Sequence, residues 1–158
     1  METETATHAN FQVPAKARRA FTATTRDGDI IIGGGITQGG RHFDMLAEVW
    51  SINPQNSTQW SRLPDLPFAN FAPAMINLRG DLYIFGGMKM TKDGYEYVNH
   101  VYKLQRNKKN WVHSGRFLNE RKGFVQPVLY QEKAALLGGH SYDYVGRDGP
   151  VSAFELFY

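Results

Sequence analysis

Short apolar runs separated by polar turns dominate the chain. Three of these runs end in a glycine pair, and they cover residues 29–32, 81–85 and 133–137. Runs this short, bounded by glycine, are typical of buried strands and not of helices. Before each run, across a tight polar turn, lies a segment rich in aromatic and β-branched residues, at 21–25, 71–78 and 124–130. The pattern therefore predicts three β-hairpins.

Further strand-like segments follow each hairpin. Residues 48–52, 99–104 and 151–158 are read as third strands. The stretches that begin near Trp60 and Trp111 are read as fourth strands, and the third repeat ends before any such Trp. We therefore expect four-stranded antiparallel sheets, with three strands in the last repeat.

The glycine pairs recur at a fixed period. Gly34-Gly35, Gly86-Gly87 and Gly138-Gly139 are 52 residues apart both times. An aromatic residue follows each pair by fifteen residues, at Trp50, Tyr102 and Phe154. A period near 50 residues in register indicates one supersecondary unit stacked on copies of itself.

The second repeat resembles the Kelch repeat. The matching residues are the run Asp81-Leu82-Tyr83-Ile84-Phe85-Gly86-Gly87, then Tyr102, then Trp111. The resemblance covers nearly the whole chain and implies an all-β propeller built from four-stranded blades. It also implies structural roles, because the glycines end the second strand and the aromatics pack between blades. The residues expected in these roles are Gly34, Gly35, Gly86, Gly87, Gly138, Gly139, Trp50, Trp60, Tyr102, Trp111 and Phe154. A sugar-stacking platform is the other interpretation of these aromatics.

The chain is interpreted as one Kelch-type domain over residues 1–158. Its expected parts are an N-terminal segment 1–17, blade 1 at 18–63, blade 2 at 64–114 and blade 3 at 115–158. Propellers usually need about four to eight blades to close. Three blades therefore predict a partner for ring closure.

The N-terminal segment offers one way to close the ring. Pro14 precedes Phe21 by seven residues, as Pro64 precedes Phe71, so residues 10–14 resemble a displaced fourth strand. Paired with residues 151–158 of another chain, this strand would complete blade 3 and give a six-bladed homodimer by strand exchange. The alternative is that the chain is the final part of a longer propeller.

Composition sets the broad class. The chain has 158 residues, of which 42% are hydrophobic and 13% aromatic, so it can bury a core. It contains no run of about 18 apolar residues and no signal peptide, so we expect a cytoplasmic protein without membrane contact. The absence of cysteine excludes disulfides and thiolate metal sites, and neither a metal nor a cofactor is predicted.

The charge is modestly positive. The formal net charge is +3, and no run of Lys or Arg exceeds two residues, as at Lys108-Lys109. Nucleic-acid binding is therefore not predicted.

Three long connecting segments, at residues 36–47, 88–98 and 140–149, are expected to lie on one face, because successive strands run antiparallel. Long loops on a rigid scaffold concentrate binding residues. Within the Kelch resemblance, Arg18 and Arg121 occupy a position that often carries Arg, three residues before Phe21 and Phe124. The candidate binding residues are Arg18, Arg19, Arg41, His42, Asn70, Tyr95, Tyr97, Arg121, Lys122, His140, Tyr142 and Arg147. This mildly cationic, Tyr- and Arg-rich face predicts an interaction module for a protein partner or a small anionic or sugar ligand.

Catalysis is the alternative function. The resemblance extends to a copper radical oxidase, whose crosslinked cysteine this chain lacks, and to sialic-acid mutarotases. A mutarotase needs an acid or base, which His42 with Asp44, or His140 with Asp143, could supply. Such loop pairs also arise by chance. The alternative is therefore a carbohydrate isomerase with its site at the mouth of the central channel, near Arg18, Arg19, Arg121 and His140.

Overall fold

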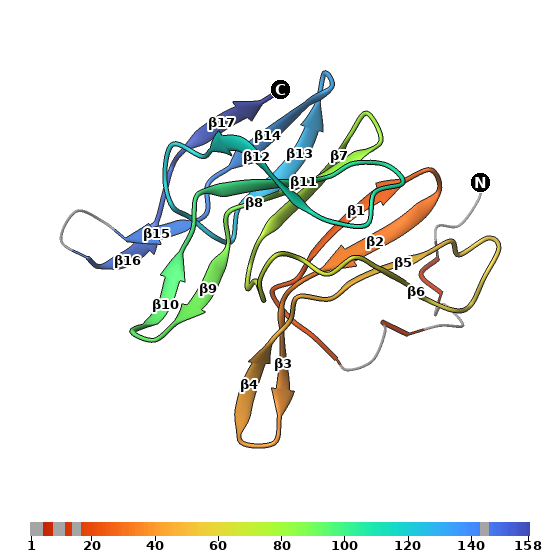
Figure 1. Ribbon diagram of the computed structural model, residues 1–158, viewed down its shortest axis with the longest axis horizontal. Coiled ribbons are helices and arrows are strands. Elements are labelled where there is room, and N and C mark those ends of the chain that lie inside the picture. Colours follow the sequence, from red (N-terminus) through yellow and green to blue (C-terminus); the bar gives the residue numbers. More distant parts are fainter. Residues whose placement is uncertain (1–4, 8–11, 14–16, 143–145) are drawn as a thin grey trace.

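The computed structural model describes residues 5–7, 12–13, 17–142 and 146–158 (Figure 1). As predicted, the described residues form strands in antiparallel sheets and no helix. Of the expected N-terminal strand, only Gln12 and Val13 lie within the described residues.

Blade 1 is a four-stranded antiparallel sheet. Its strands follow the order of the chain: β1 (Thr22–Arg26), β2 (Asp29–Gly33), β5 (Val49–Ile52) and β6 (Ser61–Leu63). The turn between β1 and β2 contains Asp27 and Gly28, both with positive φ, which closes the hairpin in two residues.

Blade 2 repeats this arrangement. Its strands are β7 (Ala74–Leu78), β8 (Asp81–Phe85), β11 (His100–Leu104) and β12 (Val112–Phe117). β8 pairs with β7 on one side and with β11 on the other, and β12 forms the outer edge.

Blade 3 has three strands in the described chain. They are β13 (Gln126–Tyr130), β14 (Lys133–Leu137) and β17 (Phe154–Phe157). β17 takes the place that β11 takes in blade 2, and within the described residues no strand pairs with its outer side.

The three segments expected as long loops are hairpins. The structure shows β3 (Ile36–Gly39) paired with β4 (His42–Met45), β9 (Met88–Thr91) with β10 (Gly94–Tyr97), and β15 (His140–Tyr142) with β16 (Asp148–Pro150). The long connections are thus present as expected, but each contains a two-stranded hairpin that was not predicted. Pairing satisfies backbone groups that a loop of this length leaves to solvent.

The backbone structure at the start of each blade repeats every 52 residues. Isolated bridges join Arg19 to Ile36, Phe71 to Met88 and Gly123 to His140. Ala20, Ala72 and Phe124, each one residue later, have φ values of 51°, 53° and 55°. The predicted equivalence of Arg18 and Arg121 is therefore wrong by one residue. Lys122, and in blade 2 Asn70, occupy the position of Arg18.

The core lies between neighbouring blades. Ile31 of blade 1 packs with Met75 and Ile84 of blade 2, and the exposed fractions of these side chains are 3% or less. A second cluster joins Phe85 of blade 2 to Leu136 of blade 3. β7 contributes to both clusters, since Met75 faces blade 1 while Ala74, Ile76 and Leu78 face blade 3.

The first glycine of each pair allows a close blade-to-blade approach. Gly34 has φ +67°, and a Cβ added there would lie 2.6 Å from the carbonyl oxygen of Asn70 in the next blade. Gly86 has φ +56° and would place its Cβ even nearer to the carbonyl oxygen of Lys122. No side chain fits such a gap.

The predicted structural aromatics differ in burial. Trp111 is buried in the cluster between blades 1 and 2, and Tyr102 packs against that cluster. Trp50 is half-buried, with the Arg62 guanidinium over its ring at 4.9 Å. Phe154 is 60% exposed, so in this chain it does not lie in a core.

Candidate binding face

Three hairpins project from one side of the blades. β3–β4, β9–β10 and β15–β16 each follow a glycine pair, and Figure 1 shows them on the side opposite to the β1–β2, β7–β8 and β13–β14 turns. Antiparallel connectivity brings them together, as expected from the sequence. We call the hairpins and the segments that precede β1, β7 and β13 the hairpin face.

Hairpins β9–β10 and β15–β16 contact each other through tyrosines. The rings of Tyr97 and Tyr142 meet edge to face, with centroids 5.0 Å apart. Tyr97 donates its hydroxyl to Asp148 Oδ1 at 2.8 Å, and the Tyr142 hydroxyl donates to the Tyr95 carbonyl at 3.3 Å. Burial, followed by the hydrogen bond to Asp148, raises the pKa of Tyr97 above its usual value. Tyr97 is 1% exposed, so it holds the two hairpins together and does not offer its ring to a ligand.

Asp148 also lies near His140. The distance from His140 Nδ1 to Asp148 Oδ1 is 3.8 Å, and both side chains are about half exposed. The predicted partner of His140, Asp143, lies outside the described residues. Sequence reasoning did not pair His140 with Asp148. The sequence signal that could have drawn attention to Asp148 is the repeat spacing. Asp44, Glu96 and Asp148 are 52 residues apart and therefore mark a repeated acidic position.

The other predicted acid–base pair has no recorded contact in the described structure. His42 and Asp44 both belong to β4, where His42 pairs with Gly39 and Asp44 with Thr37. Both side chains are exposed.

Arg121 lies at the start of blade 3, on the hairpin face. Its guanidinium forms an ion pair with Glu96 of β10, and the side chain is 62% exposed. Surface pairs of this kind contribute little to stability, so Arg121 is available to a partner at low cost.

The first hairpin presents a separate basic and aromatic pair. The Arg19 guanidinium lies 4.9 Å from the centroid of the Phe43 ring, and Phe43 is 53% exposed. Both residues line a shallow pocket of about 340 Å³. Arg41 and Arg147 are exposed at the tips of the first and third hairpins.

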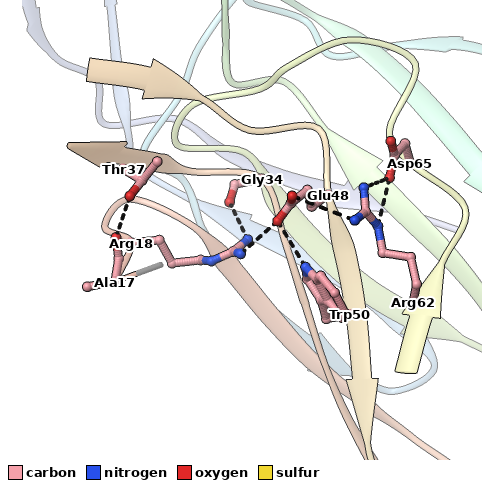
Figure 2. A network of polar contacts seen from close by, with 8 residues as sticks. All are labelled: Ala17, Arg18, Gly34, Thr37, Glu48, Trp50, Arg62 and Asp65. Carbon is pink, nitrogen blue, oxygen red and sulfur yellow. Dashed lines mark hydrogen bonds and ion pairs between the residues drawn. The ribbon is translucent and has the colours of Figure 1, made fainter. Parts of the chain in front are cut away.

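Arg18, a predicted binding residue, lies inside the chain. Figure 2 shows its guanidinium directed at Glu48, with Arg18 Nη2 and Glu48 Oε2 3.0 Å apart and the Arg18 side chain fully buried. Glu48 also accepts the indole N–H of Trp50 at 3.0 Å and lies 3.6 Å from Arg62. Burial raises the pKa of Glu48, but the hydrogen bonds from Trp50 and Arg18 and the charge of Arg62 outweigh burial and lower it overall.

Two more predicted binding residues are buried at the equivalent position. Asn70 donates its amide N–H to the Gly86 carbonyl at 3.0 Å. Lys122 is fully buried and forms an ion pair with Glu155 of β17. The equivalent positions 18, 70 and 122 therefore each carry a buried polar side chain whose partner lies within its own blade. We leave these three residues out of the proposed binding surface.

The described residues form no helix long and apolar enough to cross a membrane. No cluster of three or more His, Cys, Asp or Glu side chains within them is arranged to hold a metal ion.

Sheets stacked blade against blade, with hairpins on one side, define a β-propeller. No family model matches the chain. Over 126 residues it is 30% identical to human Kelch-like protein 40, a match that covers 77% of this chain and 18% of that protein. The solved structure titled "Structure of YjhT" has a similar fold, with a TM-score of 0.66 and 19% identity, covering 81% of this chain and 36% of the other. Together with the repeat motifs, the similarity to Kelch-like protein 40 shows that the chain belongs to the Kelch-repeat family.

Proposed function

We propose that the chain is an interaction module that binds a protein partner through four exposed residues of the hairpin face. These residues are Tyr95, Arg121, His140 and Tyr142, and we call them the Tyr–Arg surface. The observation that carries the proposal is the contact of two hairpins through Tyr97, Tyr142 and Asp148. It brings residues from blades 2 and 3 together before any partner binds.

The composition of this surface suits protein binding. Tyr95 and Tyr142 are 47% and 46% exposed. Tyr and Arg are enriched among the residues that dominate binding energy at protein interfaces. Because the hairpins are already fixed, binding loses less conformational entropy than with mobile loops.

A comparison of the wild type with two variants tests the proposal. The immobilised chain captures proteins from a lysate, each captured protein is identified and purified, and its affinity is then measured against the wild type and the variants. Combining Arg121→Ala with Tyr142→Ala should weaken binding by at least about thirtyfold, since anchor residues contribute about 2 kcal/mol or more. Lys109→Ala is the control, because Lys109 is exposed between β11 and β12 on the opposite side. Unchanged affinity in the double variant would contradict the proposal.

A carbohydrate isomerase is the second candidate function. The observation in its favour is the approach of His140 to Asp148, since a His–carboxylate pair can move a proton. We propose that the ligand would then be an anionic sugar held near Arg121. NMR measurement of sialic-acid anomerisation decides between the two candidates. Catalysed exchange that His140→Ala abolishes favours the isomerase, and exchange at the uncatalysed rate favours the module.

Two finer proposals accompany this function. We propose a cytoplasmic location and a homodimer in which two copies of the chain complete one ring. The homodimer is supported by the presence of three sheets in the described residues and by the outer side of β17, with which no described strand pairs.

A further inference from the structure

Each blade joins the next through a repeated backbone hydrogen bond at the start of its first strand. Ala72 N–H of blade 2 donates to the Ala20 carbonyl of blade 1 at 2.8 Å. Phe124 N–H of blade 3 donates to the Ala72 carbonyl of blade 2 at 2.9 Å. The three residues are 52 apart and share a positive φ, so the joint is the same each time.

A second bond repeats beside the first two glycine pairs. Gly35 N–H donates to the Asn70 carbonyl of the following blade, and Gly87 N–H donates to the Lys122 carbonyl, both at 2.8 Å. A joint between neighbouring blades therefore has two parts. The earlier blade offers a carbonyl and a glycine N–H, and the later blade offers an N–H and a carbonyl.

Blade 3 presents the first half of this joint without a following blade. Among the described residues, no hydrogen bond is recorded to the Phe124 carbonyl or from the Gly139 N–H. The space beside Gly138 is open as well, since an added Cβ would meet nothing nearer than the Val151 carbonyl at 3.5 Å. At Gly34 and Gly86 the next blade fills that space.

Blade 3 buries an apolar face of blade 2. The equivalent apolar face of blade 3 itself is exposed. Ile76, Leu78 and Phe85 of blade 2 are 6%, 4% and 0% exposed and pack against blade 3. The residues 52 positions later, Val128, Tyr130 and Leu137, are 42%, 54% and 38% exposed. The face of blade 3 thus has the composition of a joint but no covering blade.

Blade 1 presents the other half. Within the described chain, the Ala20 N–H has no recorded partner, whereas Ala72 and Phe124 donate theirs to the preceding blade. The contact of Gln12 is a second indication that blade 1 is built to follow another blade. The Trp60 indole N–H donates to the Gln12 carbonyl at 2.6 Å, as the Trp111 indole N–H donates to the Pro64 carbonyl at 2.9 Å. Pro64 directly follows β6, the outer strand of the blade before Trp111, so Gln12 lies where the end of a preceding blade's outer strand would lie.

We propose that blade 1 of a second copy docks on the exposed face of blade 3. In this joint the Ala20 N–H of the second copy donates to the Phe124 carbonyl, and the Gly139 N–H donates to the second copy's residue 18 carbonyl. The side of β1 that carries Ala23 and Thr25 covers Val128 and Tyr130, because Met75 of β7, the counterpart of Ala23, faces the preceding blade. Two such joints, related by a twofold axis, close a ring of six blades. This inference rests on the proposed homodimer and names its interface.

The occupant is a second copy because the two open edges of one chain are complementary. Each group that blade 3 leaves without a partner matches one that blade 1 offers, at the spacing of the two joints seen within the chain. A further blade from another polypeptide is the competing occupant. It would leave the purified chain monomeric.

Mass measurement by light scattering over a concentration series tests the interface. The wild type is expected at twice 17.9 kDa. Gly138→Ala adds a Cβ where the second copy's carbonyl should approach, and an overpacking cost of about 1–3 kcal/mol at each of two joints should weaken dimerisation at least about thirtyfold. Gly40→Ala is the matched control, because Gly40 has a similar φ of +63° and nothing within 4 Å of an added Cβ.

A second pair of variants guards against misfolding of Gly138→Ala. Val128→Asp places a charge on the exposed face of blade 3 and should also give a folded monomer by circular dichroism. Val112→Asp, at a site 50% exposed on β12, should remain dimeric. A monomeric wild type would overturn the homodimer together with its interface. A dimeric wild type whose Gly138→Ala and Val128→Asp variants dimerise equally well would overturn this interface alone.

Discussion

Arg18 Nη2 and Glu48 Oε2 lie 3.0 Å apart, and they join the segment before β1 to the segment before β5. The Arg18 side chain is fully buried, whereas Glu48 is 27% exposed and also contacts Trp50 and Arg62. Loss of either partner would leave the other charge without its main compensation. This pair therefore stabilises blade 1 and is unsuited to ligand capture.

Glu48→Ala should destabilise the chain by about 3 kcal/mol, because Arg18 would remain buried beside an apolar methyl group. Glu48→Gln should cost less, since its amide oxygen can still accept hydrogen bonds from Arg18 and Trp50. Urea unfolding followed by Trp fluorescence measures both changes. Equal stability of Glu48→Ala and the wild type would contradict the role of the ion pair.

The same pair predicts an acid dependence. The pKa of Glu48 in the folded chain lies below the ordinary value of 4.5, so the ion pair stabilises the fold at any pH above that value. This contribution is lost as the pH falls through the lowered folded pKa. The stability difference between wild type and Glu48→Gln should therefore be constant from about pH 6 to 5 and shrink below about pH 4. Urea unfolding at each pH measures it, and a difference that grows towards acid would contradict the sign.

Gly86→Ala should destabilise the chain more than Gly40→Ala. Both residues have positive φ, at +56° and +63°, so the backbone cost of about 1 kcal/mol is common to both. Only at Gly86 does the added Cβ collide with the Lys122 carbonyl of the next blade. The difference should be about 2 kcal/mol or more. Thermal unfolding monitored by circular dichroism measures it, and equal melting temperatures would show that blades 2 and 3 are not tightly joined at this point.

Tyr97 should resist ionisation. Its pKa is raised by burial and by the hydrogen bond to Asp148. In a pH titration followed by phenolate absorbance, Tyr97→Phe should therefore leave the signal at about pH 11 unchanged, because a free tyrosine ionises near pH 10. The variant should also lose about 1 kcal/mol of stability. Tyr95→Phe is the control for stability, since Tyr95 is 47% exposed and should lose less. A loss of phenolate signal at about pH 11 in Tyr97→Phe would contradict the burial of Tyr97.

The strands were predictable from the sequence because their signal is local. The strand ending at Phe85 was predicted from its apolar run and its glycine pair, and it forms β8 as expected. The hairpins β9–β10 and β15–β16 were not predicted from the sequence. β9 and β10 alternate apolar and polar residues over only four residues each, and β15 and β16 have three residues each, which is too short for the alternation to distinguish a strand from a polar loop.

The binding residues were harder to predict, because burial depends on contacts that sequence does not display. Lys122 and Arg18 have the composition of exposed residues, yet Glu155 and Glu48 allow their burial. Arg121, directly before Lys122, is exposed. Counting the 52-residue period strictly, instead of aligning Phe21 with Phe124, would have placed Lys122 at the buried position.

The contact between Gln12 and Trp60 predicts a role for the N-terminal segment. Deleting residues 1–13 removes the carbonyl that accepts the Trp60 indole N–H, as Pro64 does for Trp111. The truncated chain should show a red-shifted Trp emission and should be monomeric by light scattering, since the expected fourth strand of the second copy's blade 3 is lost. Deletion of residues 1–7 is the control, because it spares Gln12 and the expected strand at 10–14. If the longer truncation still dimerises, strand exchange is wrong and the joint between blade 3 and blade 1 holds the ring without it.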